Sequence, residues 1–162
     1  MKDRINKLPW IKSARIERHL PNKISLTLFE RTPMARWQTN KMLKLIDIHG
    51  DVIPRVDVSR FLNLPIIIGK NAPKIAGQIL KTLSNEPHLF RRIKSLTLVS
   101  DRRWDVQLDN QINVHLPEKN PGKAWAHLAT VEQGHNIFGD QIQGIDMRSV
   151  SYTHLTLPTR LM

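Results

Sequence analysis

The sequence contains no cysteine, and this absence excludes several kinds of structure and chemistry. A disulfide scaffold, a thiol nucleophile and a cysteine-ligated zinc site all need that residue. Long apolar runs are missing too: none exceeds that of Ile66-Ile67-Ile68, far short of the ~20 residues with which a helix crosses a bilayer. The first residues carry charge with no apolar segment behind them, unlike a signal peptide. By itself this polypeptide is therefore expected to stay in the cytoplasm.

Motifs for catalysis and metal binding are also missing. The seven histidines never form a His-x-x-x-His pair, and the seven glycines are dispersed, with none opening a phosphate-binding loop. The Gly-x-Ser-x-Gly motif of serine hydrolases is absent. The sequence therefore predicts no catalytic residue, no metal site and no cofactor, and we expect the protein not to be an enzyme.

Positive charge is abundant but scattered. The 25 Lys and Arg exceed the 14 Asp and Glu, for a net charge of +11, which favours an acidic partner such as nucleic acid, an anionic membrane or an acidic protein. No basic run is interleaved with aromatic residues, and there is a single tyrosine. The pattern favours a solvated basic surface. A basic α+β domain that binds nucleic acid is the alternative interpretation.

The hydrophobic pattern predicts two β-hairpins in the first third of the chain. Between residues 14 and 30, apolar and polar residues alternate on both sides of Pro21-Asn22, a pair typical of turns. Thr32-Pro33 ends this unit, because proline cannot donate a ladder hydrogen bond. A second hairpin is predicted over residues 43–53, with its turn at His49-Gly50-Asp51.

Two helices and several strands are predicted further along. The first helix begins at Asn71 and Pro73, and its apolar stripe consists of Ile75, Ile79, Leu80 and Leu83. The second begins at Asn120-Pro121 and carries Trp125, Leu128 and Val131. A short helical stretch is predicted at 89–93, and strands at 64–69, 96–99, 104–108, 112–116 and 142–148. Mainly antiparallel strands with two or three helices predict the α+β class.

Several segments resemble one bacterial family in consistent order. Leu8-Pro9-Trp10-Ile11 leads into a basic strand, a Leu20-Pro21-Asn22 turn and a strand that continues into Glu30-Arg31-Thr32-Pro33 and on to Trp37. This is similar to the second half of the POTRA domain of FtsQ/DivIB cell-division proteins. Residues 45–52, 64–69, 102–108, 114–118 and 145–148 resemble successive strands of that family's β domain. The resemblance implies the C-terminal part of a POTRA domain over residues 1–37 and an FtsQ/DivIB-type β domain over residues 38–148.

The family resemblance also implies a function. It predicts a non-catalytic scaffold that recruits or links division proteins at the septum, with FtsB, FtsL and other division membrane proteins as partners and no nucleic acid. The parent protein is expected to cross the inner membrane once, by a span outside this sequence, with its bulk in the periplasm. Binding is expected through an added partner strand at a sheet edge. The predicted partner-binding residues are Arg102, Arg103, Trp104, Ile145, Asp146, Met147 and Arg148.

Both ends of the sequence depart from the family pattern. The family's cytoplasmic tail, membrane helix and first POTRA elements have no counterpart before Met1. Residues 150–159 look like the translation of a sequencing-library adapter, so residues 149–162 are interpreted as a non-native tail. Thr153, Leu155 and Leu157 nevertheless alternate with polar residues, and this pattern predicts a weakly held strand paired with residues 142–147.

Overall fold

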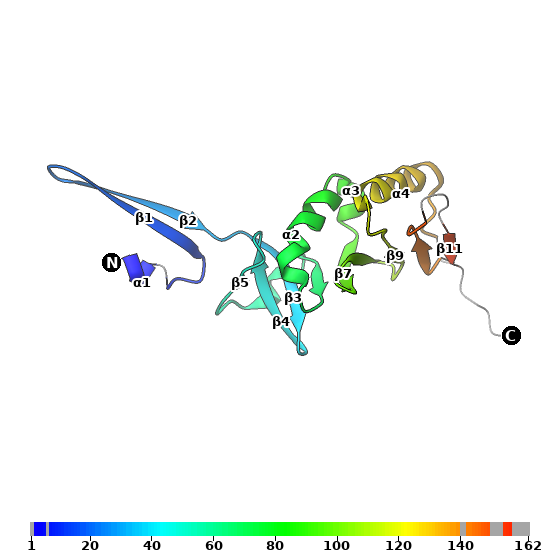
Figure 1. The fold of residues 1–162 in the computed structure, drawn as a ribbon, viewed down its shortest axis with the longest axis horizontal. Helices are drawn as coiled ribbons and strands as arrows, with labels where there is room; N and C mark the ends of the chain where they lie inside the picture. Colours follow the sequence, from blue (N-terminus) through cyan, green and yellow to red (C-terminus); the bar gives the residue numbers. More distant parts are fainter. Residues whose placement is uncertain (1, 6, 140–141, 150–153, 157–162) are drawn as a thin grey trace.

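The computed structural model describes residues 2–5, 7–139, 142–149 and 154–156, which form two separate β-sheets and several helices. The helix α1 (Lys2–Ile5) precedes a two-stranded antiparallel hairpin of β1 (Ile11–His19) and β2 (Lys23–Glu30). The hairpin extends away from the rest of the chain (Figure 1). Its strands end on either side of Pro21-Asn22, so the predicted hairpin and turn are confirmed.

The apolar residues of the hairpin share one face. Ile16 pairs with Leu26, Ala14 with Leu28, and polar residues occupy the positions between them. Ala14 is buried near the base of the hairpin, where α1 contacts β1, whereas Ile24 near the tip is 70% exposed. The hairpin therefore has an apolar face that is only partly covered by the described residues.

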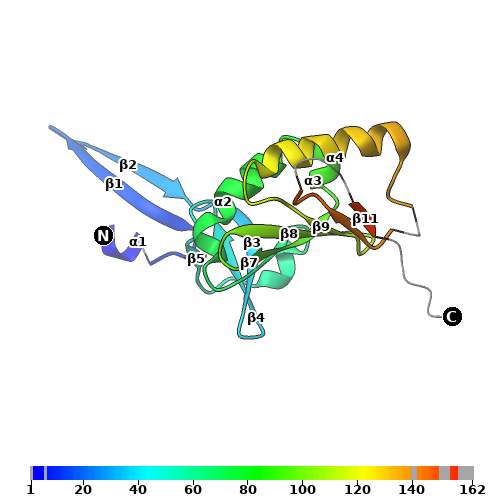
Figure 2. The same ribbon diagram turned by 45° about the vertical axis from the view of Figure 1, so that its right-hand side comes forward.

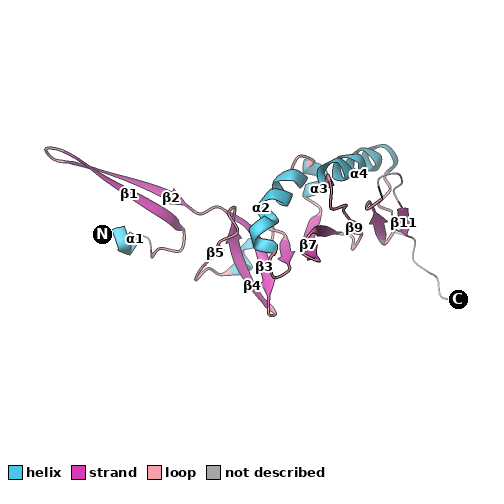
Figure 3. Ribbon diagram, viewed as in Figure 1, coloured by secondary structure: helices cyan, strands magenta, loops and turns pink. Residues whose placement is uncertain are grey.

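The second sheet contains nine strands in the order β11-β10-β9-β8-β7-β6-β3-β4-β5. Its pairings are antiparallel except for β3–β6, β6–β7 and β9–β10, which are parallel. This mixture of sheets and helices confirms the predicted α+β class (Figure 3). The strands are β3 (Pro33–Thr39), β4 (Met42–Asp47), β5 (Val52–Ile53), β6 (Ile66–Ile68), β7 (Ile93–Val99), β8 (Arg103–Leu108), β9 (Asn113–His115), β10 (Gly144–Asp146) and β11 (His154–Thr156).

Helices cover one face of this sheet. They are α2 (Ala72–Leu83), α3 (Pro87–Phe90) and α4 (Pro121–His135), and Figure 2 shows α2 and α4 lying over the strands. The short 3₁₀ helix η1 (Val58–Phe61) contacts β4. In the described part of the chain no helix is long and apolar enough to cross a membrane.

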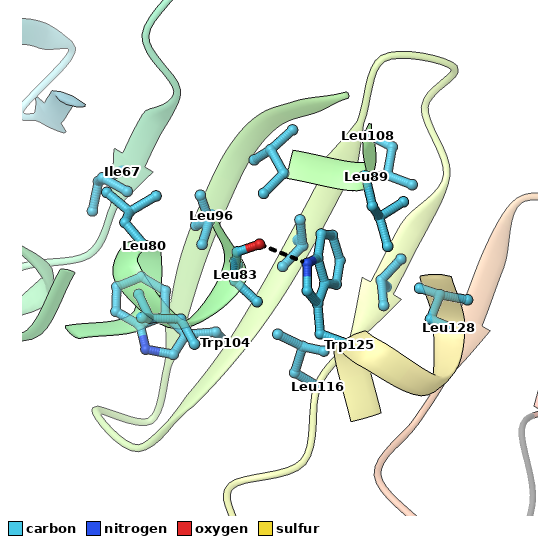
Figure 4. Packing of buried hydrophobic residues seen from close by; sticks show 14 of the residues in the cluster. Ile67, Leu80, Leu83, Leu89, Leu96, Trp104, Leu108, Leu116, Trp125 and Leu128 are labelled. Atoms are coloured by element: carbon cyan, nitrogen blue, oxygen red, sulfur yellow. Dashed lines mark hydrogen bonds between the residues drawn. The ribbon is translucent and has the colours of Figure 1, made fainter. Parts of the chain in front are cut away.

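The main core lies between the helices and the sheet. Trp125 of α4 is fully buried, and its indole N–H donates a hydrogen bond of 3.0 Å to the carbonyl of Leu83 at the end of α2 (Figure 4). The Leu83 carbonyl also accepts from the backbone N–H of Glu86, at 3.2 Å. The group that depends on the bond from Trp125 is the buried indole N–H, which would be costly to leave unpaired. This indole bond also ties α4 to α2 within the core cluster that includes Leu96 and Leu116.

The two sheets are joined by a short connection between Glu30 and Pro33. The N–H of Arg31 donates to the carbonyl of Trp10, and the N–H of Ile48 donates to the carbonyl of Thr32. Thr32-Pro33 thus marks the end of the hairpin, as predicted, but Pro33 also begins a new strand of the larger sheet. The predicted domain boundary after residue 37 falls inside that strand, and it stays a prediction.

Some predicted details were wrong. Ile75 does not join the core with Ile79, Leu80 and Leu83, since it is 37% exposed, and Ala76 and Ala72 complete the buried face of α2 instead. Asn71 is the N-cap residue of α2, so the predicted start of this helix is confirmed, but its side chain donates to Asp101 and forms no hydrogen bond with the helix. The short helix lies at Pro87–Phe90, so it begins before the predicted stretch and overlaps only its first two residues, and residue 93 already belongs to β7.

Candidate protein interface

The nine-stranded sheet ends at β10 and β11, which is where the sequence predicted a partner-binding edge. Gly144, Ile145 and Asp146 of β10 run parallel to Asn113, Val114 and His115 of β9. On its outer side β10 pairs antiparallel with β11, and Ile145 lies opposite Leu155. The predicted strand within residues 153–157 is therefore confirmed at residues 154–156, and the predicted Thr153 and Leu157 lie outside the described residues.

The seven predicted partner-binding residues do not lie on one surface. Trp104, Ile145 and Met147 are buried in the core between the sheet and the helices. Because side chains alternate along a strand, Arg103 and Asp146 point to the opposite face of the sheet, and Arg148 follows Asp146 there. Arg102 lies in the turn between β7 and β8 and is exposed.

On that opposite face the structure brings together a row of four charged side chains and one histidine, which we call the charged row. Asp105 of β8 lies opposite His115 of β9, and His115 lies opposite Asp146 of β10. The Nδ1 atom of His115 is 3.0 Å from a carboxylate oxygen of Asp105, and the Nε atom of Arg103 is 3.9 Å from the other oxygen. The charged row consists of Arg103, Asp105, His115, Asp146 and Arg148.

One end of the charged row is a bidentate ion pair. Arg148 donates from Nε to both carboxylate oxygens of Asp146, at 2.8 and 3.0 Å, and its Nη2 atom also contacts that carboxylate. This contact with Arg148 is the main reason why the pKa of Asp146 lies well below its ordinary value, although partial burial acts in the other direction. The same contact raises the pKa of Arg148. Both groups therefore stay charged beside the β10 strand across the physiological pH range.

Asp105 and His115 were not among the predicted site residues. The alternation of Arg103, Asp105 and Gln107 with buried neighbours indicates that these polar residues share a face. Nothing in the spacing of the sequence shows that β8, β9 and β10 lie side by side, because β9 and β10 are joined through α4. The row depends on this parallel pairing, which sequence periodicity does not encode.

Among the described residues, no group of three or more His, Asp or Glu side chains could hold a metal ion. Asp105, His115 and Asp146 lie in one row, but two of the three take part in the arginine contacts given above.

Two family models match this chain. Residues 35–148 match the C-terminal part of the cell division protein FtsQ/DivIB, and residues 1–31 match an FtsQ-type POTRA domain. The first match covers the larger sheet from within β3 through β10, and the second covers α1 and the hairpin.

Curated relatives agree with the family models. The chain is 32% identical over 148 residues to the cell division protein FtsQ of Caulobacter vibrioides (strain NA1000 / CB15N), an alignment covering 91% of this chain and 49% of that protein. It is 31% identical to FtsQ of Rhizobium meliloti (strain 1021), with 94% and 50% covered. It is 33% identical to FtsQ of Rickettsia typhi (strain ATCC VR-144 / Wilmington), with 89% and 54% covered. The chain spans about half the length of these relatives.

A solved structure is also similar. The major extracytoplasmic domain of the cell division protein DivIB from Geobacillus stearothermophilus aligns with a TM-score of 0.46 and 10% sequence identity. The alignment covers 68% of this chain and 98% of that domain.

Proposed function

Because this chain belongs to the FtsQ/DivIB family of cell division proteins, we propose that it is a non-catalytic scaffold that binds other division proteins at the septum. The observation that carries the proposal is the end of the nine-stranded sheet. There β10 pairs on its outer side with β11, which is the outermost strand among the described residues. An edge strand presents unpaired backbone N–H and C=O groups, and a strand from another protein can pair with them.

The proposed binding mode is β-augmentation. A partner segment adds to the sheet at this edge and forms main-chain hydrogen bonds, while its side chains alternate between the two faces. On one face they meet the charged row, in which Arg148 and Asp146 lie nearest the edge. A partner strand with charges complementary to this pair is therefore favoured over one with an apolar face.

The proposed partners are FtsB- and FtsL-type division proteins, together with other membrane proteins of the division machinery. The parent protein is proposed to be anchored in the inner membrane by a single span outside this sequence, with these two sheets in the periplasm. Residues 149–162 are proposed to be a non-native tail that takes the place of the family's last strand. Such a tail can pair with β10 through its backbone, but it does not carry the side chains that the family has in its last strand.

The proposal is tested by titration with an FtsB-like peptide. We compare this chain with a version in which a family-type ending replaces residues 150–162, and we measure binding by calorimetry at two salt concentrations. We expect the family-type ending to bind at least about tenfold more tightly, with a modest dependence on salt.

Two results would count against the proposal. Equal affinity of the two chains would contradict the proposal that a non-native tail has replaced the family's last strand. If the peptide bound to neither chain, the proposed scaffold function at this edge would be contradicted. Duplex DNA serves as the control ligand. Tight binding of DNA that falls steeply with salt would favour the nucleic-acid alternative.

A further inference from the structure

A groove lies on the helix-covered side of the larger sheet, on the opposite face from the charged row. Its volume is about 520 Å³, within the range of cavities that hold a small molecule or a few side chains of a peptide. Three parts of the chain form it: α2, the turn between β7 and β8, and the segment that leads into α4. Its lining includes Ile75, Ile79, Arg102, Trp104, Glu118 and Lys123.

The groove has an apolar floor and one exposed apolar wall. Ile79 and Trp104 belong to the core and show little of their surface. Ile75 lies one helical turn before Ile79 and is 37% exposed. The apolar stripe of α2 is therefore wider than the part that the sheet and α4 cover, and its uncovered margin lines a concave site. Apolar surface exposed in a concavity is typical of a binding site rather than of ordinary solvent-facing helix.

The rim of the groove has an excess of positive charge. Arg102 projects from the β7–β8 turn and Lys123 from the first turn of α4, and Glu118 is the acidic residue that lines the groove. None of these three side chains forms an ion pair with any described residue. Unpaired cations on a concave, partly apolar surface favour a ligand with negative charge beside an apolar group.

Close helix packing fixes one end of the groove. A Cβ atom added at Gly122 would lie 2.7 Å from the methyl carbon of Thr82, so the start of α4 and the end of α2 meet there with no room for a larger residue. This contact keeps Lys123 beside the α2 wall. Two helices that the core already holds together thus form one end of the groove.

We propose that this groove binds a short acidic segment of a partner protein. An apolar side chain of the segment lies between Ile75 and Trp104, and its carboxylates lie beside Arg102 and Lys123. The groove is on the opposite side of the sheet from the charged row, so this is a second binding surface. It does not depend on the proposed edge at β10 and β11.

The test uses the complete chain, labelled with ¹⁵N, and three short synthetic peptides. The first carries two leucines flanked by glutamates, the second has lysines in place of the glutamates, and the third has alanines in place of the leucines. We expect the first peptide to shift the indole N–H signal of Trp104 and the amide signal of Ile75, and the other two to bind on the order of tenfold more weakly. Equal binding of the lysine peptide would overturn the proposal.

Paired variants separate this groove from general charge attraction. The double variant Arg102→Glu with Lys123→Glu is expected to weaken binding of the acidic peptide about tenfold or more. The control, Arg60→Glu with Lys94→Glu, makes the same change in charge at exposed residues that do not line the groove, and it is expected to bind nearly as well as the unaltered chain. Circular dichroism establishes that each variant is folded. An equal loss of affinity in both double variants would overturn the proposal. NMR shifts confined to residues 144–146 would also overturn it, and would place the peptide at the edge of the sheet instead.

Discussion

The guanidinium of Arg31 donates a hydrogen bond of 2.8 Å to the carboxylate of Asp47, and this ion pair joins the end of the hairpin to the larger sheet. Asp47 is the last residue of β4 and is 1% exposed, the one buried charged side chain of the described part of the chain. Its other oxygen accepts from the N–H groups of His49 and Asp51. One carboxylate therefore holds both the β4–β5 turn and the connection between the two sheets.

Removing this carboxylate is expected to destabilise the protein. Asp47→Ala leaves Arg31 without its partner and two N–H groups of the turn without an acceptor, so we expect the free energy of unfolding to fall by about 3 kcal/mol. Urea unfolding followed by tryptophan fluorescence measures this change. The matched control is Asp51→Ala in the same turn, whose side chain is exposed; it is expected to change stability by less than about 0.5 kcal/mol. Equal effects would contradict the role given to Asp47.

Asp47 also predicts how stability depends on pH. Burial by itself raises the pKa of this carboxyl, but the hydrogen bonds from Asp51, His49 and Arg31 outweigh it and lower the pKa below its ordinary value. A carboxyl whose pKa is lower in the folded state contributes stability above its unfolded pKa of ~3.9 and loses that contribution as the pH falls through the folded value. The difference in unfolding free energy between the unaltered chain and Asp47→Asn is therefore expected to shrink below about pH 4. If the difference in unfolding free energy grew as the pH fell, the lowered pKa of Asp47 would be contradicted.

Gly50, in the same turn, is expected not to tolerate a side chain. Its φ is +81°, and a Cβ atom there would lie 2.1 Å from the carbonyl oxygen of Pro73 in α2. Gly50→Ala is expected to cost about 1–3 kcal/mol for the strained backbone alone, and the clash with main chain adds to this. Gly134→Ala is the control, because Gly134 lies inside α4 with nothing near its Cβ position. It is expected to stabilise the protein by about 0.5–1 kcal/mol. Thermal unfolding is expected to show a lower melting temperature for Gly50→Ala and a higher one for Gly134→Ala.

The outer part of the hairpin is expected to open easily. Ile24 and Leu26 remain 70% and 49% exposed, so each forfeits much of the ~1.5–3 kcal/mol that full burial provides. Hydrogen exchange followed by mass spectrometry is expected to show faster exchange at residues 24–28 than in β7 and β8, whose side chains form the core. Protection of residues 24–28 equal to that of β8 would contradict this.

The local elements of the fold could be predicted from the sequence. Period-two alternation around Pro21-Asn22 gave the hairpin, and the turn at Gly50 gave β4 and β5. Ile75 shows what the apolar pattern could not predict. The stripe indicates which side of α2 faces the core, but not how much of that side the core covers. Pro33 was read only as the end of one strand, although a proline is also tolerated as the first residue of the next.

The candidate site was harder to predict because it depends on strand order. Arg103 and Asp146 were predicted, but Trp104, Ile145 and Met147 beside them are core residues, since a strand turns neighbouring side chains to opposite faces. His115 joins the site only because β10 returns through α4 to lie parallel to β9. That return is long-range, and no local pattern specifies its register.

The position of β6 has a consequence for the order in which the sheet folds. β3–β4 and β7–β8 are hairpins whose short turns close at little entropic cost, whereas β6 is separated from β3 by residues 40–65 and from β7 by residues 69–92. Its three residues pair in parallel with both neighbours. We therefore expect the two parts of the sheet on either side of β6 to nucleate separately and β6 to join them late, with Ile67→Val mainly accelerating unfolding. A folding rate that falls in proportion to the loss of stability would show instead that β6 is already in place at the transition state.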